Sequence, residues 1–143
     1  MLLLLPASAQ PANRSAMEVR TAQLLREYRQ LGKRSFETKW PGGKIKEKYD
    51  REPDGTYSYA KLYPTGGFAI KCQRKPSGLV TYERWSGSGT LMEMLHYDER
   101  TTDYTAYWPN GSKAAKYLAN SRTREVFCEA RDPKGKQTYP RRR

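Results

Sequence analysis

The sequence predicts a mainly β protein: an elongated antiparallel β-meander of about four to five hairpin repeats of about 23 residues each, preceded by one N-terminal α-helix. Two observations predict this fold. Glycines recur at a regular spacing from residue 38 onward, and apolar residues before that point follow a helical period. A period of roughly 20 to 50 residues is typical of repeat proteins, in which each unit buries its apolar face only against its neighbours.

The composition excludes a thick aliphatic core. The chain has 143 residues, with 11 Tyr and 3 Trp, and a formal net charge of +12 from 27 Lys and Arg against 15 Asp and Glu. Leu, Ile, Val and Phe are scarce, which together with a high net charge usually indicates disorder. A thin stacked sheet resolves this conflict, because tyrosines and long Lys and Arg stems can cover it. No stretch reaches the roughly 18 apolar residues of a membrane helix.

Residues 1–9, MLLLLPASA, are interpreted as the remnant of a signal peptide. The apolar run ends at Pro6 and is followed by Ala7-Ser8-Ala9, a small-x-small pattern that signal peptidase accepts. No basic residue precedes Arg14 and the run is short, so we expect the leader to start upstream. This favours a periplasmic or secreted protein, with a cytoplasmic protein as the alternative.

Residues 10–35 predict a linker and a capping helix over about residues 16–31. Ser15 and Glu18 have the spacing of a capping box, and Gly32 is placed to end the helix. One apolar stripe is expected to face the repeats, formed by Met17, Leu24, Leu25, Tyr28 and Leu31. The polar residues of the helix are expected to be solvated: Arg20, Arg26, Glu27 and Arg29.

The repeat domain is predicted over residues 36–139. Its units are KWPGGKIKEKY (39–49), LYPTGGFAIKC (62–72), RWSGSGTLMEML (84–95), YWPNGSKAAKYL (107–118) and a degraded RDPKGKQTY (131–139). An aromatic residue ends one strand, and a glycine beyond it supplies the positive φ of a hairpin turn. The structural repeat residues are Trp40, Gly43, Tyr63, Gly66, Trp85, Gly89, Trp108 and Gly111. We expect looser hairpins in the third and fifth units, and looser turns between units.

This unit resembles the bacterial form of the MORN-type repeat, most clearly in YWPNGSKAAKYL and KWPGGKIKEKY. The resemblance covers roughly residues 38–139, and the family's second glycine matches at Gly55 and Gly78 but is missing from the later units. It implies a non-enzymatic, elongated β-sheet scaffold. Relatives serve in protein association, in some cases as antitoxin or immunity partners, and in others at membranes.

The residues offer little for catalysis or metal binding. His96 is the only histidine, and Cys72 and Cys128 lack the close spacing and further ligands of a zinc site. On the predicted strand order the two cysteines lie five strands apart, about 24 Å at ~4.8 Å per strand. A disulfide needs Cα atoms within about 7 Å. The sequence therefore predicts no enzyme, no cofactor, no metal and no disulfide between these cysteines.

The positive charge predicts a basic, Tyr-rich face that stacking of the repeats would assemble. The candidate partner-binding residues are Lys44, Lys46, Lys48, Tyr57, Tyr59, Lys61, Tyr82, Arg84, Tyr104, Tyr107, Lys113 and Lys116. An acidic protein partner is the preferred interpretation, and the family resemblance alone suggests an immunity or antitoxin role. Binding of anionic envelope lipid or polysaccharide is the alternative. A leader argues against a nucleic-acid partner, and the charge could also serve only to solubilise the sheet and discourage edge pairing. Residues 140–143 are expected to form a basic tail.

Overall fold

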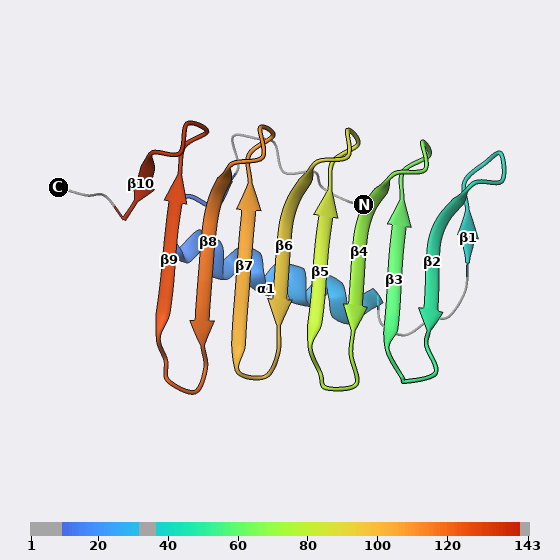
Figure 1. Ribbon diagram of the computed structural model, residues 1–143, viewed down its shortest axis with the longest axis horizontal. Helices are drawn as coiled ribbons and strands as arrows, with labels where there is room; N and C mark the ends of the chain where they lie inside the picture. The colour runs from blue at the N-terminus through green and yellow to red at the C-terminus, as the bar shows by residue number, and fades with distance from the viewer. Residues whose placement is uncertain (1–9, 32–36, 141–143) are drawn as a thin grey trace.

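The computed structural model describes residues 10–31 and 37–140, which form one helix and a single open sheet of ten antiparallel strands (Figure 1). The strands lie side by side in chain order, so every connection is a hairpin. The elements are α1 (Arg14–Leu31), β1 (Thr38–Lys39), β2 (Ile45–Arg51), β3 (Tyr57–Leu62), β4 (Phe68–Arg74), β5 (Val80–Trp85), β6 (Leu91–Tyr97), β7 (Thr101–Tyr107), β8 (Lys113–Asn120), β9 (Val126–Arg131) and β10 (Gln137–Tyr139). The predicted meander with its N-terminal helix is confirmed. The leader remnant, Gly32 and residues 141–143 lie outside the described residues.

The helix begins two residues earlier than the sequence predicts, and its cap is different. The Asn13 side chain accepts a hydrogen bond from the Ala16 backbone N–H at 2.9 Å, and its carbonyl accepts one from Met17 at 3.0 Å. Asn is as favourable an N-cap as Ser, so the earlier residue takes this position. The predicted capping box of Ser15 and Glu18 is therefore wrong, and Glu18 instead pairs with Arg14 at 2.8 Å.

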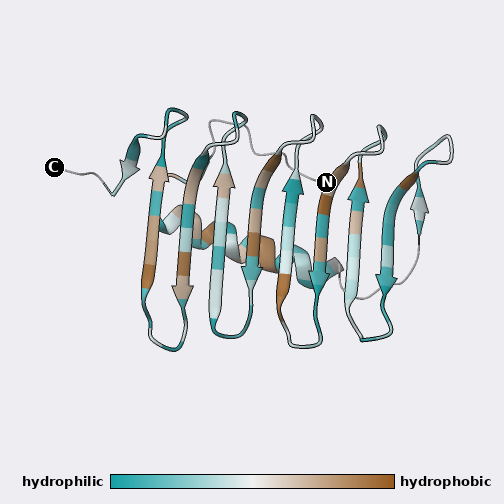
Figure 2. Cartoon of the chain, in the orientation of Figure 1, coloured by the Kyte–Doolittle hydropathy of each residue, from teal (hydrophilic) through white to brown (hydrophobic). Residues whose placement is uncertain are grey.

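Helix α1 crosses one face of the sheet (Figure 1). Its 18 residues span about 27 Å, the width of roughly six strands. Met17 and Leu24 are fully buried and belong to one cluster with Tyr59 and Leu95 of the sheet. Figure 2 shows hydrophobic segments of the helix where it passes behind the strands. Met17, Leu24, Leu25 and Tyr28 of the predicted stripe therefore pack against the sheet, and the side chain of Leu31 lies outside the described part of the chain.

Tyrosine replaces aliphatic side chains in the sheet's half of this core. Residues paired directly across strands share a face, and the central row under the helix reads Tyr49, Tyr59, Cys72, Tyr82, Leu95, Tyr104, Tyr117 and Cys128. Tyr82, Leu95 and Tyr104 are at most 1% exposed. A tyrosine ring buries a large area while its hydroxyl reaches a polar partner, so a thin sheet can form a core with few aliphatic residues.

The upper turns, which join β1 to β2, β3 to β4 and so on, share one hairpin geometry. In the turn that starts at Tyr63, the Tyr63 N–H donates to the Gly67 carbonyl and the Gly66 N–H donates to the Tyr63 carbonyl, both at 2.8 Å. Gly66 has a φ of 93°, which a side chain would disfavour. The turn beginning at Ser86 has the same pair of bonds, at 2.8 and 3.0 Å, and so does the turn beginning at Asp132. The expected looser hairpins in these units are therefore wrong, because Ser86 rather than Trp85 holds the position of Tyr63.

The lower turns explain the uneven period of the repeat. Successive turn glycines from Gly43 to Gly135 are separated by 23, 23, 22 and 24 residues. The intervening lower turns are closed by backbone bonds that join Glu52 to Thr56, Lys75 to Leu79, Asp98 to Thr101 and Asn120 to Glu125. Their lengths of five, five, four and six residues account for every difference. The first two have the same tight geometry as the upper turns, so only the last two depart from it.

Cys72 and Cys128 are free, and they lie on β4 and β9, five strands apart, as the sequence predicts. Cys72 is 4% exposed, and burial raises the pKa of its thiol to about 12. A thiol held in this state is a poor nucleophile. We therefore assign Cys72 to the core.

Candidate functional site

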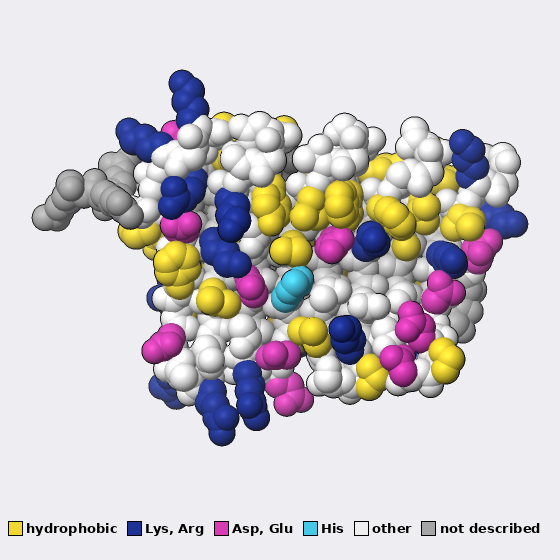
Figure 3. Space-filling model, viewed as in Figure 1, with side chains coloured by type: hydrophobic (Ala, Val, Ile, Leu, Met, Phe, Trp, Pro, Cys, Tyr) yellow, Lys and Arg dark blue, Asp and Glu magenta, His cyan; other side chains and the backbone are white. Residues whose placement is uncertain are grey.

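The sheet presents one face that α1 does not cover, called the open face here (Figure 3). Two of its rows run from β2 to β9. They are Lys48, Ala60, Lys71, Glu83, Met94, Thr105, Lys116 and Glu129, and Asp50, Ser58, Gln73, Thr81, His96, Asp103, Leu118 and Phe127. Both positive and negative side chains lie on this face, with the one histidine near its centre. The open face is therefore mixed in charge.

The structure divides the predicted basic, Tyr-rich face between the two sides of the sheet. Residues that pair with the helix-side rows are Tyr57, Tyr59, Lys61, Tyr82, Arg84 and Tyr104. Tyr59, Tyr82, Arg84 and Tyr104 are at most 3% exposed. The prediction that these four residues belong to a partner-binding surface is wrong, because they are buried on the side of the sheet that α1 covers, whereas Tyr57 and Lys61 are half-buried.

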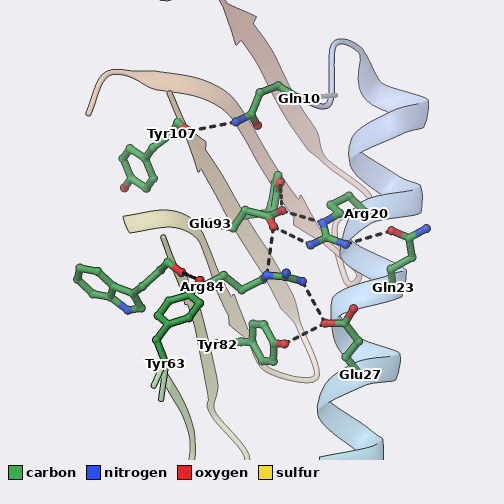
Figure 4. A network of polar contacts seen from close by, with 11 residues as sticks. Gln10, Arg20, Gln23, Glu27, Tyr63, Tyr82, Arg84, Glu93 and Tyr107 are labelled. Carbon is green, nitrogen blue, oxygen red and sulfur yellow. Dashed lines mark hydrogen bonds and ion pairs between the residues drawn. The ribbon is translucent and has the colours of Figure 1, made fainter. Parts of the chain in front are cut away.

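The other predicted partner-binding residues are accessible. Lys46, Lys48 and Lys116 lie on the open face, and Figure 4 shows the Tyr107 side chain on the side of the strands away from α1. Lys44 is exposed in the first upper turn, and Lys113 is exposed at the start of β8. These residues are spread from one end of the sheet to the other and do not form one cluster.

A buried ionic network joins α1 to the sheet (Figure 4). The Arg20 guanidinium donates two hydrogen bonds to the Glu93 carboxylate, at 2.8 and 2.6 Å, and the Tyr104 hydroxyl donates a third at 2.5 Å. Arg84 lies 3.8 Å from Glu93 and 3.5 Å from Glu27. The sequence predicts that Arg20 and Glu27 are solvated. That prediction is wrong for Arg20, which is 8% exposed on the side of α1 that faces the sheet. It holds only in part for Glu27, whose side chain is 39% exposed but contacts Arg84 and Tyr82.

This network keeps Glu93 ionised. Burial by itself raises the pKa of Glu93, but the hydrogen bonds and charge of Arg20, the Tyr104 hydroxyl and the charge of Arg84 outweigh it, and the pKa is held below its ordinary value. Burial alone would also lower the pKa of Arg20, and its contacts with Glu93 raise it instead. Because Arg20, Arg84 and Glu93 are buried and paired, the network positions the helix, and only Glu27 at its edge is partly exposed.

An apolar hollow of about 230 Å³, called the aromatic hollow here, lies at the upper end of strands β3 to β6. It is lined by Trp40, Lys61, Leu62, Tyr63, Pro64, Ala69, Arg84, Trp85 and Met92. Trp40 Nε1 donates to the Leu62 carbonyl at 3.1 Å, and the Tyr63 hydroxyl donates to the Trp85 carbonyl at 2.7 Å. These bonds fix aromatic rings of successive units. Figure 3 shows the hydrophobic side chains gathered at this end of the open face.

A second hollow of about 280 Å³, called the polar hollow here, lies below it over the middle of β3. Its small residues are Ser58 and Ala60, and its lining includes Lys48, Lys71 and Glu83. Ser58, Ala60 and Leu62 alternate with helix-side residues along β3, so the two hollows follow one another along the same strand. We call the two together the β3 groove.

The sequence predicts only a structural role for Trp40, Tyr63 and Trp85. It predicts partner binding for Lys48, Tyr59, Lys61 and Arg84 of the groove lining, but for none of the remaining lining residues. Leu62 and Met92 enter the hollow beside bulges, where cross-strand register shifts by one residue. Ser58 and Ala60 offer a signal that could have been used, because small residues between Tyr57 and Lys61 leave space over a strand. Lys71 alternates with Ile70 and Cys72, and this period of two places it on the open face.

No protein-family model matches this sequence, and no curated protein matches it. Within residues 10–31 and 37–140, no three His, Cys, Asp or Glu side chains are grouped so that they could hold a metal ion. The one helix of that part of the chain is too polar to cross a membrane. The geometry of the open face is therefore the observation from which a function can be argued.

Proposed function

We propose that this protein is a non-enzymatic repeat scaffold that binds an acidic protein partner through the β3 groove of its open face. The observation that carries the proposal is the aromatic hollow, where Trp40, Tyr63, Trp85 and Met92 line one concave apolar surface. Aromatic residues and Met are enriched at the centres of protein interfaces, and buried anchors in such hollows supply most of the binding energy.

The charge around the groove favours carboxylates on the partner. Lys48 and Lys71 flank Ala60 in one cross-strand row, with Cα atoms about 10 Å apart. A partner's Asp or Glu side chain above Ala60 would lie between the two ammonium groups. The chain's net charge of +12 would also accelerate the approach of an acidic protein.

Charge is compensated within the chain on both halves of the open face. Lys48 lies 3.5 Å from Asp50, and Lys71 pairs across strands with Glu83. Lys116 forms an ion pair with Asp103, and Arg131 lies 3.2 Å from Glu129. The β3 groove is therefore distinguished by its hollows, whose lining residues come from β2 to β6 and the adjoining turns.

The narrower version of the proposal is an immunity or antitoxin role. Its support is the resemblance to MORN-type repeats in segments such as YWPNGSKAAKYL, together with an elongated meander that leaves one face uncovered. The groove itself supports protein binding in general.

The test is a quantitative pulldown from cells of the source organism with the wild type and two charge-reversal variants. Lys48→Glu with Lys71→Glu alters the groove, and Lys134→Glu with Lys136→Glu makes the same change in charge at exposed residues of the last upper turn. We expect an acidic protein to be recovered by the wild type and the control and lost by the groove variant.

Two results would contradict the proposal. If both variants lose the protein equally, the attraction is one of net charge and the groove is not the site. If no protein is recovered and the wild type binds phosphatidylglycerol vesicles but not phosphatidylcholine vesicles, the anionic lipid alternative replaces it.

A further inference from the structure

A third hollow lies on the helix side, where the lower turns of the first two units meet the C-terminal part of α1. It has a volume of about 250 Å³ and is separate from the β3 groove. Its lining residues are Tyr28, Arg51, Gly55, Tyr57, Arg74, Lys75 and Pro76. We call it the basic pocket, because cations dominate its lining.

The sheet register brings the cations of the basic pocket together. Arg51 pairs directly with Tyr57, and Tyr57 pairs directly with Arg74, so the two arginines flank one tyrosine on the same face. Their Cα atoms are about 10 Å apart, and side chains as long as Arg can reach one ligand from both sides. Arg74 lies close enough to Tyr28 for its charge to oppose the effect of burial on the pKa of the Tyr28 hydroxyl, and Lys75 follows Arg74 at the start of the turn.

The positive charge of this pocket is not compensated by ion pairs. In the part of the chain that the structure describes, Arg20, Arg84, Lys116 and Arg131 form ion pairs with carboxylates, whereas Arg51, Arg74 and Lys75 form none. Asp54, in the adjacent turn, accepts the Thr56 backbone N–H at 2.8 Å. That bond is the main cause that lowers the Asp54 pKa, and Lys75 contributes less. Three like charges around one hollow repel each other unless an anion joins them.

We propose that the basic pocket binds a phosphate-type oxyanion. A dianionic phosphate matches this set better than a carboxylate, because two guanidinium forks can each donate in pairs to its oxygens and Lys75 adds a third charge. The phosphate is carried either by a small phosphorylated molecule or by a lipid headgroup. The site is independent of the proposed binding of a protein at the β3 groove.

The test is titration of the full chain with inorganic phosphate, followed by calorimetry and by the backbone amide NMR shifts of Gly55 and Arg74. The double variant Arg51→Gln with Arg74→Gln removes both guanidinium groups of the basic pocket. Arg122→Gln with Arg124→Gln is the matched control, since both arginines are exposed in the last lower turn and the loss of charge is the same. We expect saturable binding by the wild type and the control. In the pocket variant we expect binding to weaken by a factor of about ten or more, because the loss of even one charge-assisted hydrogen bond weakens binding about tenfold.

A second experiment tests whether the bound phosphate belongs to a lipid headgroup or to a small molecule. Sedimentation with phosphatidic acid vesicles that depends on Arg51 and Arg74, and is absent with phosphatidylcholine vesicles, assigns the site to a headgroup. Binding of inorganic phosphate without such sedimentation assigns it to a small molecule.

Three results would overturn the proposal. One is a wild type whose amide shifts respond no more to phosphate than to chloride. Another is an equal loss of binding in both double variants, which would indicate general charge attraction. The third is a pocket variant that melts at a lower temperature yet binds phosphate unchanged. In that case the two arginines only stabilise the fold, by lying near the negative C-terminal end of the α1 helix dipole.

Discussion

The two faces of this sheet are built from the same strands but differ in what each strand places there. On β5, Tyr82 and Arg84 point toward α1 and are at most 3% exposed, whereas Thr81 and Glu83, one residue away, lie on the open face and are half-buried. The side covered by the helix has a core, a buried ionic network and few accessible groups. The open side has hollows, mixed charge and no cover from the described chain. A one-layer sheet can thus form a core on one face and keep the other for binding.

The difference between the two faces also shows what holds α1 in place against the sheet. The apolar stripe of α1 is narrow, and Thr21 and Arg20 are buried within it beside Met17 and Leu24. Desolvating an ion pair costs free energy that its attraction only partly returns, so the network adds less stability than its number of contacts suggests. We infer that its main effect is on register, because Arg20 can meet Glu93 in only one placement of the helix.

The largest effect is expected when the network is broken on the covered face. Glu93→Ala leaves Arg20 and Arg84 in the core without their shared carboxylate, and should lower the free energy of unfolding by about 3–5 kcal/mol. Urea denaturation followed by circular dichroism measures this. Glu83→Ala on the open face should cost about 0–1 kcal/mol, because that carboxylate is partly solvated. Equal losses in the two variants would contradict the proposed difference between the faces.

Local signals in the sequence were sufficient for the fold. The recurrence of turn glycines such as Gly66 and Gly89 fixes a meander, because a positive φ at those positions closes each hairpin. The free cysteines follow from the same strand order. The N-cap and the third hairpin were misplaced by one or two residues, since Asn13 competes with Ser15 and Ser86 with Trp85 for one position.

The candidate site was harder to predict than the fold. Period two already places Tyr57, Tyr59 and Lys61 on one face and Lys48 on the other, but the sequence does not say which face the helix covers. Arg20 and Glu93 are 73 residues apart, and only the docked helix brings them together. The aromatic hollow depends on how Trp40, Tyr63 and Trp85 of successive units pack beside the upper turns, and strand alternation alone does not show this packing.

Acid should reduce the contribution of the ionic network on the covered face to the free energy of unfolding. The pKa of Glu93 is below its ordinary value in the folded state, so its contribution to stability is complete above the unfolded pKa of about 4.3 and is lost as the pH falls through the folded pKa. We expect Glu93→Gln to be less stable than the wild type at pH 7, and this gap to narrow below about pH 4. Urea midpoints at pH 7, 5, 4 and 3 measure the gap. A gap that stays constant down to pH 3 would mean that Glu93 does not act through its charge.

The smallest effect concerns single hydroxyl groups on the two faces. The Tyr82 hydroxyl donates to the Glu27 carboxylate at 2.9 Å under the helix, whereas no hydrogen bond is formed by the Tyr107 hydroxyl with the described residues. Tyr82→Phe should therefore cost about 0.5–1.5 kcal/mol, and Tyr107→Phe close to nothing. Both substitutions remove one oxygen from a ring that stays in place, so their difference in urea midpoint isolates the hydrogen bond. If Tyr82→Phe is as stable as the wild type, Arg84 alone is enough to hold Glu27, and the tyrosine row contributes through ring burial rather than through its hydroxyls.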